Sequence, residues 1–327
     1  MKRREFITLI GGAAMTWSQG VRAQQPAMPV VGFLHVAFPG PFTQQLVAFR
    51  QGLKQSGYVE GRNVAIEYRW ANNENDRLPE LAADLVRRQV ALIVSAGGVP
   101  SALAAKAATS TIPIVLVVGF DPVRLGLVAS LARPGGNVTG VTFLTTELMA
   151  KRLDLLRELI PQATTVGYLA DLRSVTGQEM LRDTLAAAGV LGRQIAVVEA
   201  RSSRDFEPAF ATFVERRAGA LVVAASALFD SNRDELVALA ARHKLPAIYQ
   251  ARELVSAGGL MSYGANLVDA FRLGGLYVGQ ILKGEKPANL PVQQATKIEL
   301  VINLTTAKTL GLEVPLSLMI RADEMIE

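Results

Sequence analysis

The chain of 327 residues has no cysteine and only two histidines, His35 and His243. The missing cysteine excludes disulfides, thiolate metal sites and a cysteine nucleophile. Neither histidine stands in a metal-ligand spacing such as H-E-x-x-H, and the chain has no G-x-S-x-G nucleophile turn, no phosphate-binding G-x-x-x-x-G-K-[ST] loop and no G-x-G-x-x-G after an expected strand. The sequence therefore carries no positive evidence for an enzyme and predicts neither a metal nor a cofactor.

Long apolar runs are missing too, and the apolar part of the N-terminal segment is too short to cross a bilayer. That segment begins with Arg3 and Arg4 and ends in the small residues of Val21-Arg22-Ala23, as a secretory signal does. The paired arginines resemble a twin-arginine export signal, although Lys2 and Thr8 depart from its pattern. We expect residues 1–23 to be an export signal peptide; a frayed basic N-terminus is the alternative.

Export changes what the charge means. The whole chain has a net charge of +5, and three of those positive charges belong to residues 1–23. The remaining excess is too small for a nucleic-acid-binding surface, so no nucleic-acid partner is predicted. We expect a periplasmic protein that begins near Gln24. It should be soluble and not lipid-anchored, because no cysteine follows the signal.

Short β-branched runs alternate with longer amphipathic stretches from residue 30 to residue 143. The expected strands are Val30–His35, Asn63–Ala71, Ala91–Ser95, Ile112–Gly119 and Val138–Phe143. The expected helices between them are Phe42–Ser56, Leu78–Arg88, Pro100–Thr109 and Leu125–Leu131. This alternation predicts a parallel, doubly wound sheet.

The same alternation begins again after residue 145. The expected strands are Thr165–Ala170, Gln194–Ala200, Ala220–Ala225, Ala247–Gln250 and Leu260–Tyr263, and the expected helices are Thr146–Ile160, Gln178–Ala188, Arg204–Arg217, Ser231–His243 with Ser231 as N-cap, and Leu267–Leu282. A long extended run over Gln293–Asn303 and a helical turn over Thr305–Leu310 follow. The predicted fold class is α/β, with two doubly wound parallel-sheet lobes joined by crossing segments.

Polar, glycine and aromatic residues gather just past the expected strand ends, where open α/β sheets bind ligands. The candidate ligand-binding residues are His35, Phe38, Ser95, Gly97, Gly98, Phe120, Asp121, Asp171, Ser174, Ser226, Phe229, Tyr249 and Tyr263. The stretch from Ser95 to Ser101 would expose backbone N–H groups at a helix N-terminus to a carboxylate. Asp121 would hold a ligand ammonium group, and the aromatic rings would form apolar walls.

Each of these residues also has an ordinary structural interpretation. The segment from Ser95 to Ser101 fits any strand-to-helix turn, and His35 is as consistent with a structural histidine as with a ligand contact. Asp121 and Asp171 could form an acid–base pair across a cleft, but turn-forming or isolated polar roles fit them better. The argument for a two-sided cleft depends on these residues occurring together in both halves.

Several longer segments resemble the soluble substrate-binding proteins of bacterial ABC importers, and in particular an ABC-type family of which some members take tryptophan or tyrosine. The segments are Val31-Gly32-Phe33-Leu34, Phe49-Arg50-Gln51-Gly52-Leu53, Gly57-Tyr58-Val59-Glu60-Gly61-Arg62-Asn63-Val64, Leu78-Pro79-Glu80-Leu81-Ala82, Ile112-Pro113-Ile114-Val115, Asp121-Pro122-Val123, 131–140 (LARPGGNVTG), Ile302-Asn303-Leu304-Thr305-Thr306-Ala307-Lys308 and Arg321-Ala322-Asp323-Glu324.

The resemblance implies a type I periplasmic-binding fold, in which a small molecule is trapped when two lobes close. It implies three crossings near Leu144, Tyr263 and Ala295, with residues 24–144 plus 264–294 as the first lobe and residues 145–263 plus 295–327 as the second. It also implies a membrane permease of an ABC importer as partner, and we expect a monomer. The expected ligand is an amino acid or an aromatic acid. A ligand-sensing module that reports to a membrane partner and an exported α/β enzyme are the alternatives.

Overall fold

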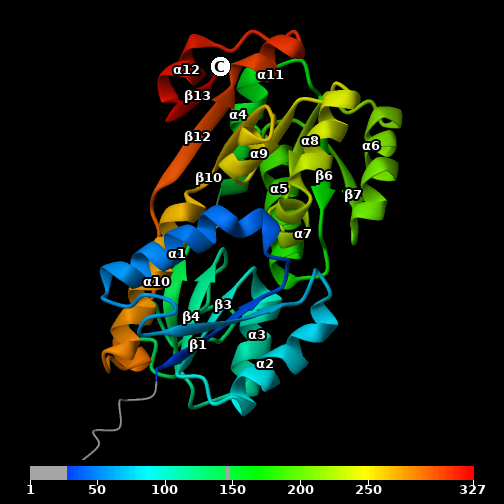
Figure 1. The fold of residues 1–327 in the computed structure, drawn as a ribbon. Helices are drawn as coiled ribbons and strands as arrows, with labels where there is room; N and C mark the ends of the chain where they lie inside the picture. The colour runs from blue at the N-terminus through cyan, green and yellow to red at the C-terminus, as the bar shows by residue number, and fades with distance from the viewer. Residues whose placement is uncertain (1–27, 144–147) are drawn as a thin grey trace, which may run out of the picture.

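Two α/β lobes, each built on its own sheet, make up the computed structural model, which describes residues 28–143 and 148–327 (Figure 1). The predicted export signal and the predicted crossing near Leu144 lie outside these residues. The predicted fold class is confirmed, since each lobe is a mainly parallel sheet between helices. No helix in the described ranges is both long and apolar enough to span a bilayer.

The first lobe contains a six-stranded sheet in the order β11-β5-β4-β3-β1-β2, and all of its strand pairs are parallel. Its strands are β1 (Val30–His35), β2 (Ala65–Trp70), β3 (Leu92–Ala96), β4 (Ile114–Val118), β5 (Val138–Thr142) and β11 (Gln293–Gln294). Its helices are α1 (Thr43–Gln55), α2 (Leu78–Arg87), α3 (Val99–Ala108) and α10 (Leu267–Leu282).

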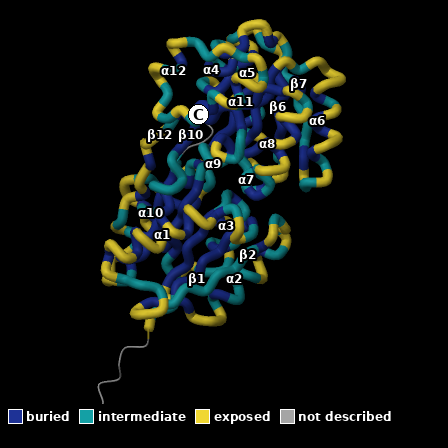
Figure 2. The backbone as a smooth tube through the Cα atoms, turned by 45° about the horizontal axis from the view of Figure 1, so that its top comes forward, coloured by how far each residue is buried: buried dark blue, intermediate teal, exposed yellow. Residues whose placement is uncertain are grey.

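Alternate residues of these strands point to opposite faces of the sheet and pack into two different hydrophobic cores. Leu34 and Ile93 pack with α2 and α3 on one face of the sheet. Phe33 and Val94 pack with α1 and α10 on the other. Strand β4 is buried at every position, as expected for an apolar run that is covered on both faces. In Figure 2 the tube is buried along β1 and of intermediate exposure along the edge strand β2, and exposed residues lie on the outer helices and turns.

The second lobe contains a seven-stranded sheet in the order β13-β12-β10-β9-β8-β6-β7, in which β10 and β12 form an antiparallel pair. Its strands are β6 (Thr165–Ala170), β7 (Gln194–Glu199), β8 (Ala220–Val223), β9 (Ala247–Tyr249), β10 (Met261–Ala265), β12 (Ile298–Asn303) and β13 (Glu324–Ile326). Its helices are α4 (Met149–Leu159), α5 (Val175–Val190), α6 (Phe206–Glu215), α7 (Ala227–Ser231), α8 (Arg233–Arg242), α9 (Arg252–Ser256), α11 (Leu304–Thr309) and α12 (Leu316–Arg321).

The chain crosses between the lobes more than once. After β10 it returns to the first lobe, where α10 packs against α1 and β11 pairs with β5. It then enters the second lobe again with β12. The run Gln293–Asn303, expected as one extended segment, is therefore two strands in two different sheets. The lobe boundaries themselves stay a prediction.

Helices α1 and α10 lie so close together that only glycine fits at their crossing. A Cβ atom on Gly52 would lie 1.9 Å from the carbonyl oxygen of Arg272, and one on Gly275 would lie 2.1 Å from that of Phe49. Both clashes are with helix backbone, which cannot rotate away as a side chain can. These glycines thus set the spacing of the two helices that cover one face of the first sheet.

Two local predictions are wrong. Residues 125–131 form hydrogen-bonded turns and bends instead of a helix, with the N–H of Leu127 donating to the carbonyl of Pro122. The expected helix Ser231–His243 is two helices, α7 and α8, and Ser231 ends the first of them. Its hydroxyl donates to the carbonyl of Ala227 (2.6 Å), so it does not cap the following helix. The side chain that caps α7 is Ser226.

Candidate functional site

The ends of strands from both sheets meet at a cleft between the lobes. The cleft encloses about 1090 Å³ of space, its open mouth included. Residues that follow β1, β3 and β4 line it from the first lobe, and residues that follow β6, β8 and β9 line it from the second. This is where parallel α/β sheets place ligands, because helix N-termini and loops converge there.

His35 ends β1 and is completely buried, with one edge on the cleft. The N–H of Ala37 donates to its Nδ1 atom (3.0 Å), so in the neutral ring Nε2 carries the proton. Burial lowers the pKa of His35 to about 3, and the ring lies 4.4 Å from that of Phe42 and 4.9 Å from that of Trp70. Nε2 has no hydrogen-bond partner within the described chain. His35 is therefore a neutral donor held at the cleft wall.

The loop after β3 comes close to this ring and leads into α3. Gly97 and Gly98 have φ angles of +86° and +117°, which favour glycine. A Cβ atom on Gly97 would lie 2.8 Å from Cε1 of His35. No side chain caps α3, and Pro100 stands in its first turn. The first backbone N–H groups of a ten-residue helix therefore face the cleft without a side-chain acceptor.

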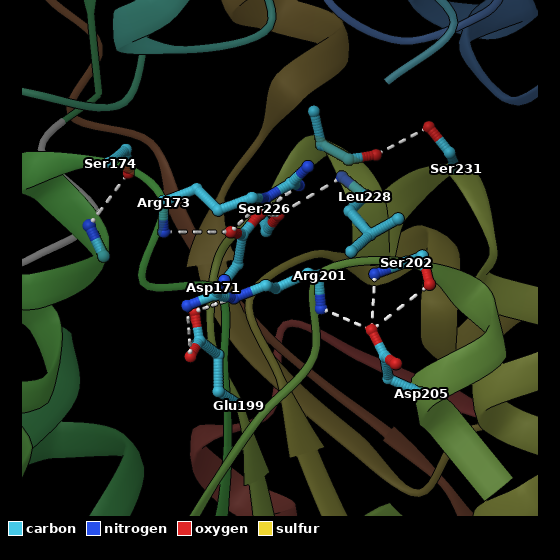
Figure 3. A network of polar contacts seen from close by, with 12 residues as sticks. Asp171, Arg173, Ser174, Glu199, Arg201, Ser202, Asp205, Ser226, Leu228 and Ser231 are labelled. Carbon is cyan, nitrogen blue, oxygen red and sulfur yellow. Dashed lines mark hydrogen bonds and ion pairs between the residues drawn. The ribbon is translucent and has the colours of Figure 1, made fainter. Parts of the chain in front are cut away.

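Asp171, Arg173 and Ser226 form one connected network on the second lobe (Figure 3). The Arg173 guanidinium donates to both carboxylate oxygens of Asp171 at 2.8 Å, and the Ser226 hydroxyl donates at 2.7 Å. Burial alone would raise the pKa of Asp171, but these hydrogen bonds hold it below its usual value. The carboxylate of Asp171 therefore already has its hydrogen-bond donors, and it holds the Arg173 guanidinium in place. Among the described residues, Nη1 of Arg173 has no hydrogen-bond partner and can donate to another group.

Ser174 and Ser226 each cap a helix that starts at the cleft. Ser174 accepts from the N–H of Gly177 (3.1 Å) at the start of α5, and Ser226 accepts from that of Leu228 (3.2 Å) at the start of α7. Together with Arg173, these helix starts place hydrogen-bond donors on this side of the cleft, beside the carboxylates of Asp171 and Asp230.

Deeper in the second lobe, the carboxyl group of Asp230 lines the cleft. The Gln250 side-chain amide donates to its Oδ1 atom. Burial, followed by the nearby Glu253, raises the pKa of Asp230 to about 7. Gln250 is 5% exposed, and its Oε1 atom has no hydrogen-bond partner among the described residues.

Among the contacts that join the lobes in the described residues, three involve polar side chains beside the cleft. The Gln45 amide of α1 donates to Glu253 of α9 (2.7 Å), Arg233 donates to the carbonyl of Pro41 (2.9 Å), and Arg124 forms an ion pair with Glu179 (2.8 Å). The structure therefore has the lobes in contact across the cleft.

Of the thirteen predicted site residues, the structure places seven in the cleft lining: His35, Gly97, Gly98, Phe120, Asp171, Ser174 and Ser226. Contact of these residues with a ligand stays a prediction. Ser95 is fully buried beneath the lining, and Phe38 lies outside it.

The other predicted aromatic residues also lie elsewhere. Phe229 packs in the core of the second lobe, 5.9 Å from the ring of Phe206. Tyr249 is buried and faces a separate cavity by α8 and α11. Tyr263 lies within β10, where its carbonyl accepts from Arg152 (2.7 Å). Phe229 and Tyr249 are thus buried inside the second lobe and Tyr263 lies within a strand, although the sequence had made all three candidate ligand-binding residues.

Asp121 also has a structural role. Its Oδ1 atom accepts from the backbone N–H groups of Val123 (2.8 Å) and Arg124 (3.4 Å), which closes the turn after β4. Asp121 is absent from the cleft lining, so the structure does not bring it together with Asp171 as an acid–base pair.

Sequence reasoning missed several lining residues: Phe42, Asn73, Asn75, Phe143, Arg173, Thr176, Asp230, Gln250 and Phe271. Arg173 and Gln250 follow strands that were correctly located, so the strand ends were the available signal. Asp230 and Phe271 lie inside helices, where nothing in the spacing marks them.

Comparison with known proteins places the chain in a family. The family model for ABC transporter substrate binding proteins matches residues 41–326. A tyrosine-binding protein of Clostridioides difficile (strain R20291) is 29% identical over 269 residues, which is 81% of this chain and 76% of that protein.

Solved structures agree with this result. The ABC domain in complex with L-Trp from Streptococcus pneumonia superposes with a TM-score of 0.82 at 25% identity, covering 91% of this chain and 99% of that one. The ligand-free, open structure of a substrate binding protein with adhesive properties from Clostridium difficile has the same identity and coverage but a TM-score of 0.64. Two more distant solute-binding proteins, at 14% and 16% identity, share the type I periplasmic-binding fold, with TM-scores of 0.62 and 0.54. The chain belongs to the family of ABC transporter substrate binding proteins.

Proposed function

We propose that this protein is the extracytoplasmic receptor of an ABC importer, and that it captures a small carboxylate-bearing ligand, an amino acid or an aromatic acid, by closing its two lobes. The observation that carries the proposal is the cleft, to which both lobes contribute polar groups. His35 and the start of α3 approach from one side, and Arg173 with the starts of α5 and α7 approaches from the other. Groups on two separate lobes can surround a ligand together only when the lobes close.

The two TM-scores support closure. This chain is 25% identical to both the L-Trp complex and the ligand-free, open structure. A difference in sequence identity therefore does not explain the difference between the two TM-scores. It superposes better on the complex, with 0.82 against 0.64. Together with the three contacts between the lobes, this favours a conformation in which the cleft is closed.

The chemistry of the cleft supports the ligand class. Uncapped helix N–H groups and the spare donors of Arg173 suit a carboxylate. Phe42, Phe120, Phe143 and Phe271 supply apolar walls. The tyrosine-binding relative and the L-Trp complex are consistent with an aromatic side chain.

A thermal-shift screen tests the proposal. A ligand at about 100 times its dissociation constant adds roughly 2.7 kcal/mol to a folded state that alone binds it. We expect at least one aromatic amino acid or aromatic acid to raise the melting temperature. Stabilisation by sugars or phosphates alone would contradict the proposed ligand class.

Export and partner are part of the same proposal. Residues 1–23 would direct the protein to the periplasm, where it works as a soluble monomer and delivers its ligand to a membrane permease. N-terminal sequencing of protein from the periplasm should begin at or near Gln24, and replacing Arg3 and Arg4 by lysine should block export. An intact Met1 would contradict the signal peptide.

A further inference from the structure

The cleft lining contains a buried acceptor oxygen, Gln250 Oε1, that no donor of the described residues reaches. Gln250 donates its amide N–H to Asp230 Oδ1, and this fixes the amide so that Oε1 points away from the carboxylate. Oε1 has no hydrogen-bond partner in the described part of the chain, although Gln250 is only 5% exposed and lines the cleft. A buried acceptor left without a donor is costly, which indicates that something else supplies one.

Asp230 lacks a cation as well. Within residues 28–143 and 148–327, no ion pair involves its carboxylate, and the nearby Arg233 pairs with Asp234 instead. The nearby charges are Glu253, which repels it, and Arg233 and Arg152, which attract it from a distance. Both arginines donate to backbone carbonyls, Arg233 to Pro41 and Arg152 to Tyr263. The carboxylate thus lies in the cleft without a directly paired cation among the described residues, and burial beside Glu253 raises its pKa.

Asp230 lies on α7, the helix whose N-cap residue belongs to the network that holds Arg173. Ser226 and Asp230 are four residues apart and lie on one face of the helix, about 6 Å from each other. Ser226 holds Asp171, which holds Arg173. Arg173 and Asp230 therefore line the same side of the cleft, so one ligand can present a carboxylate to the first and an ammonium group to the second.

We propose that the ligand's ammonium group binds between the Asp230 carboxylate and Gln250 Oε1, so that the receptor selects α-amino acids over aromatic acids without an amino group. An ammonium group has three N–H donors and one positive charge, which would satisfy Gln250 Oε1 and pair with the Asp230 carboxylate. This inference rests on the proposed function and replaces Asp121 by Asp230 as the ammonium-binding residue.

Matched ligands test it without any mutation. Titration calorimetry on the wild-type protein compares tryptophan with 3-indolepropionate, tyrosine with 3-(4-hydroxyphenyl)propionate, and phenylalanine with 3-phenylpropionate. Leaving one partner of a buried charged pair unpaired typically weakens binding by about 30-fold or more. We expect each des-amino acid to bind at least that much more weakly than its amino acid.

An isosteric variant completes the comparison. Asp230→Asn should weaken amino-acid binding by about 30-fold or more and leave the des-amino acids nearly unchanged, since they have no ammonium to lose. Its melting temperature without ligand should equal or exceed that of the wild type, because an unpaired buried carboxylate is removed. Asp121→Asn is the control and should change neither ligand series.

The outcomes separate the inference from the proposed function. If a des-amino acid binds the wild type as tightly as its amino acid, or if Asp230→Asn weakens both series equally, the ammonium site is wrong and the receptor function stands. If no amino acid and no aromatic acid binds at all, the proposed ligand class fails and the ammonium site fails with it.

Discussion

At the scale of single residues, His35 links the cleft to the stability of the first lobe. Its pKa is about 3 in the folded protein, against an ordinary value of 6.5. Between these values the unfolded chain binds a proton that the folded one does not, so the free energy of unfolding falls as the pH falls. We expect His35 to account for a loss of about 2 kcal/mol between pH 7 and pH 5. Urea unfolding at both pH values, followed by fluorescence of the neighbouring Trp70, measures it.

The variant His35→Asn keeps an acceptor near the N–H of Ala37 but cannot titrate. It should be less stable than the wild type at pH 7 and should lose about 2 kcal/mol less on going to pH 5. Val31→Ala, on the same buried strand, should be destabilised while keeping the wild-type pH dependence. Equal pH dependence in the wild type and His35→Asn would contradict the neutral, buried imidazole.

Asp121 gives a second prediction at this scale. Because its carboxylate closes the turn before Val123 and Arg124, Asp121→Ala should lower the free energy of unfolding by about 1 kcal/mol. Ligand affinity should change by less than about threefold, since the residue lies outside the cleft lining. A melting curve and one calorimetric titration check both parts. A tenfold loss of affinity with unchanged stability would instead indicate that Asp121 contacts the ligand.

These residues also show how far the site could be predicted. Gly97, Asp171 and Ser226 were found because they follow strands, and strand ends are marked by apolar runs. Phe229 was misplaced because spacing along the chain does not tell whether a ring after a strand turns inward. Asp230 was missed because its partner, Gln250, is 20 residues away in the sequence.

At the scale of elements, the contact between α1 and α10 offers a test with an internal control. Gly275→Ala would push a Cβ atom into the backbone of α1, so we expect a loss of about 1–3 kcal/mol or more. Gly189→Ala, in α5, meets nothing within 4 Å and should stabilise the protein by about 0.5–1 kcal/mol. Urea unfolding compares the two. A Gly275→Ala protein as stable as the wild type would mean that the helices can separate without cost.

Elements were predicted well where their own pattern determines them. Strands such as β4 and β6 have continuous apolar cores, and α10 was expected at its observed bounds. The missed elements are short and lie near the end of the chain or beside the cleft: α9, α12 and β13. Segments of three to six residues carry too little periodicity to be recognised, and β13 exists only because it pairs with β12.

At the scale of the whole molecule, polar side-chain contacts such as that of Arg124 with Glu179 join the lobes, beside the packing of Ala227 against the first lobe. The Arg124 side chain is 61% exposed, so its ion pair with Glu179 contributes at most about 1 kcal/mol to closure. We expect Glu179→Gln to weaken ligand binding by less than about fivefold and to reduce its dependence on salt. Glu207→Gln, which breaks an ion pair within the second lobe, should leave affinity unchanged. Calorimetry at low and high salt measures both. A larger loss would mean that this ion pair dominates closure.

The position of the Arg124–Glu179 ion pair has a mechanical consequence. The two residues belong to different lobes and lie near the surface, whereas Asp230 and Gln250 lie deep in the cleft. A partner that pulls these outer side chains apart would act as a lever on the whole cleft. It could release the bound molecule without touching it. The work required would depend on how strongly the cleft binds the ligand, and hardly at all on the Arg124–Glu179 ion pair.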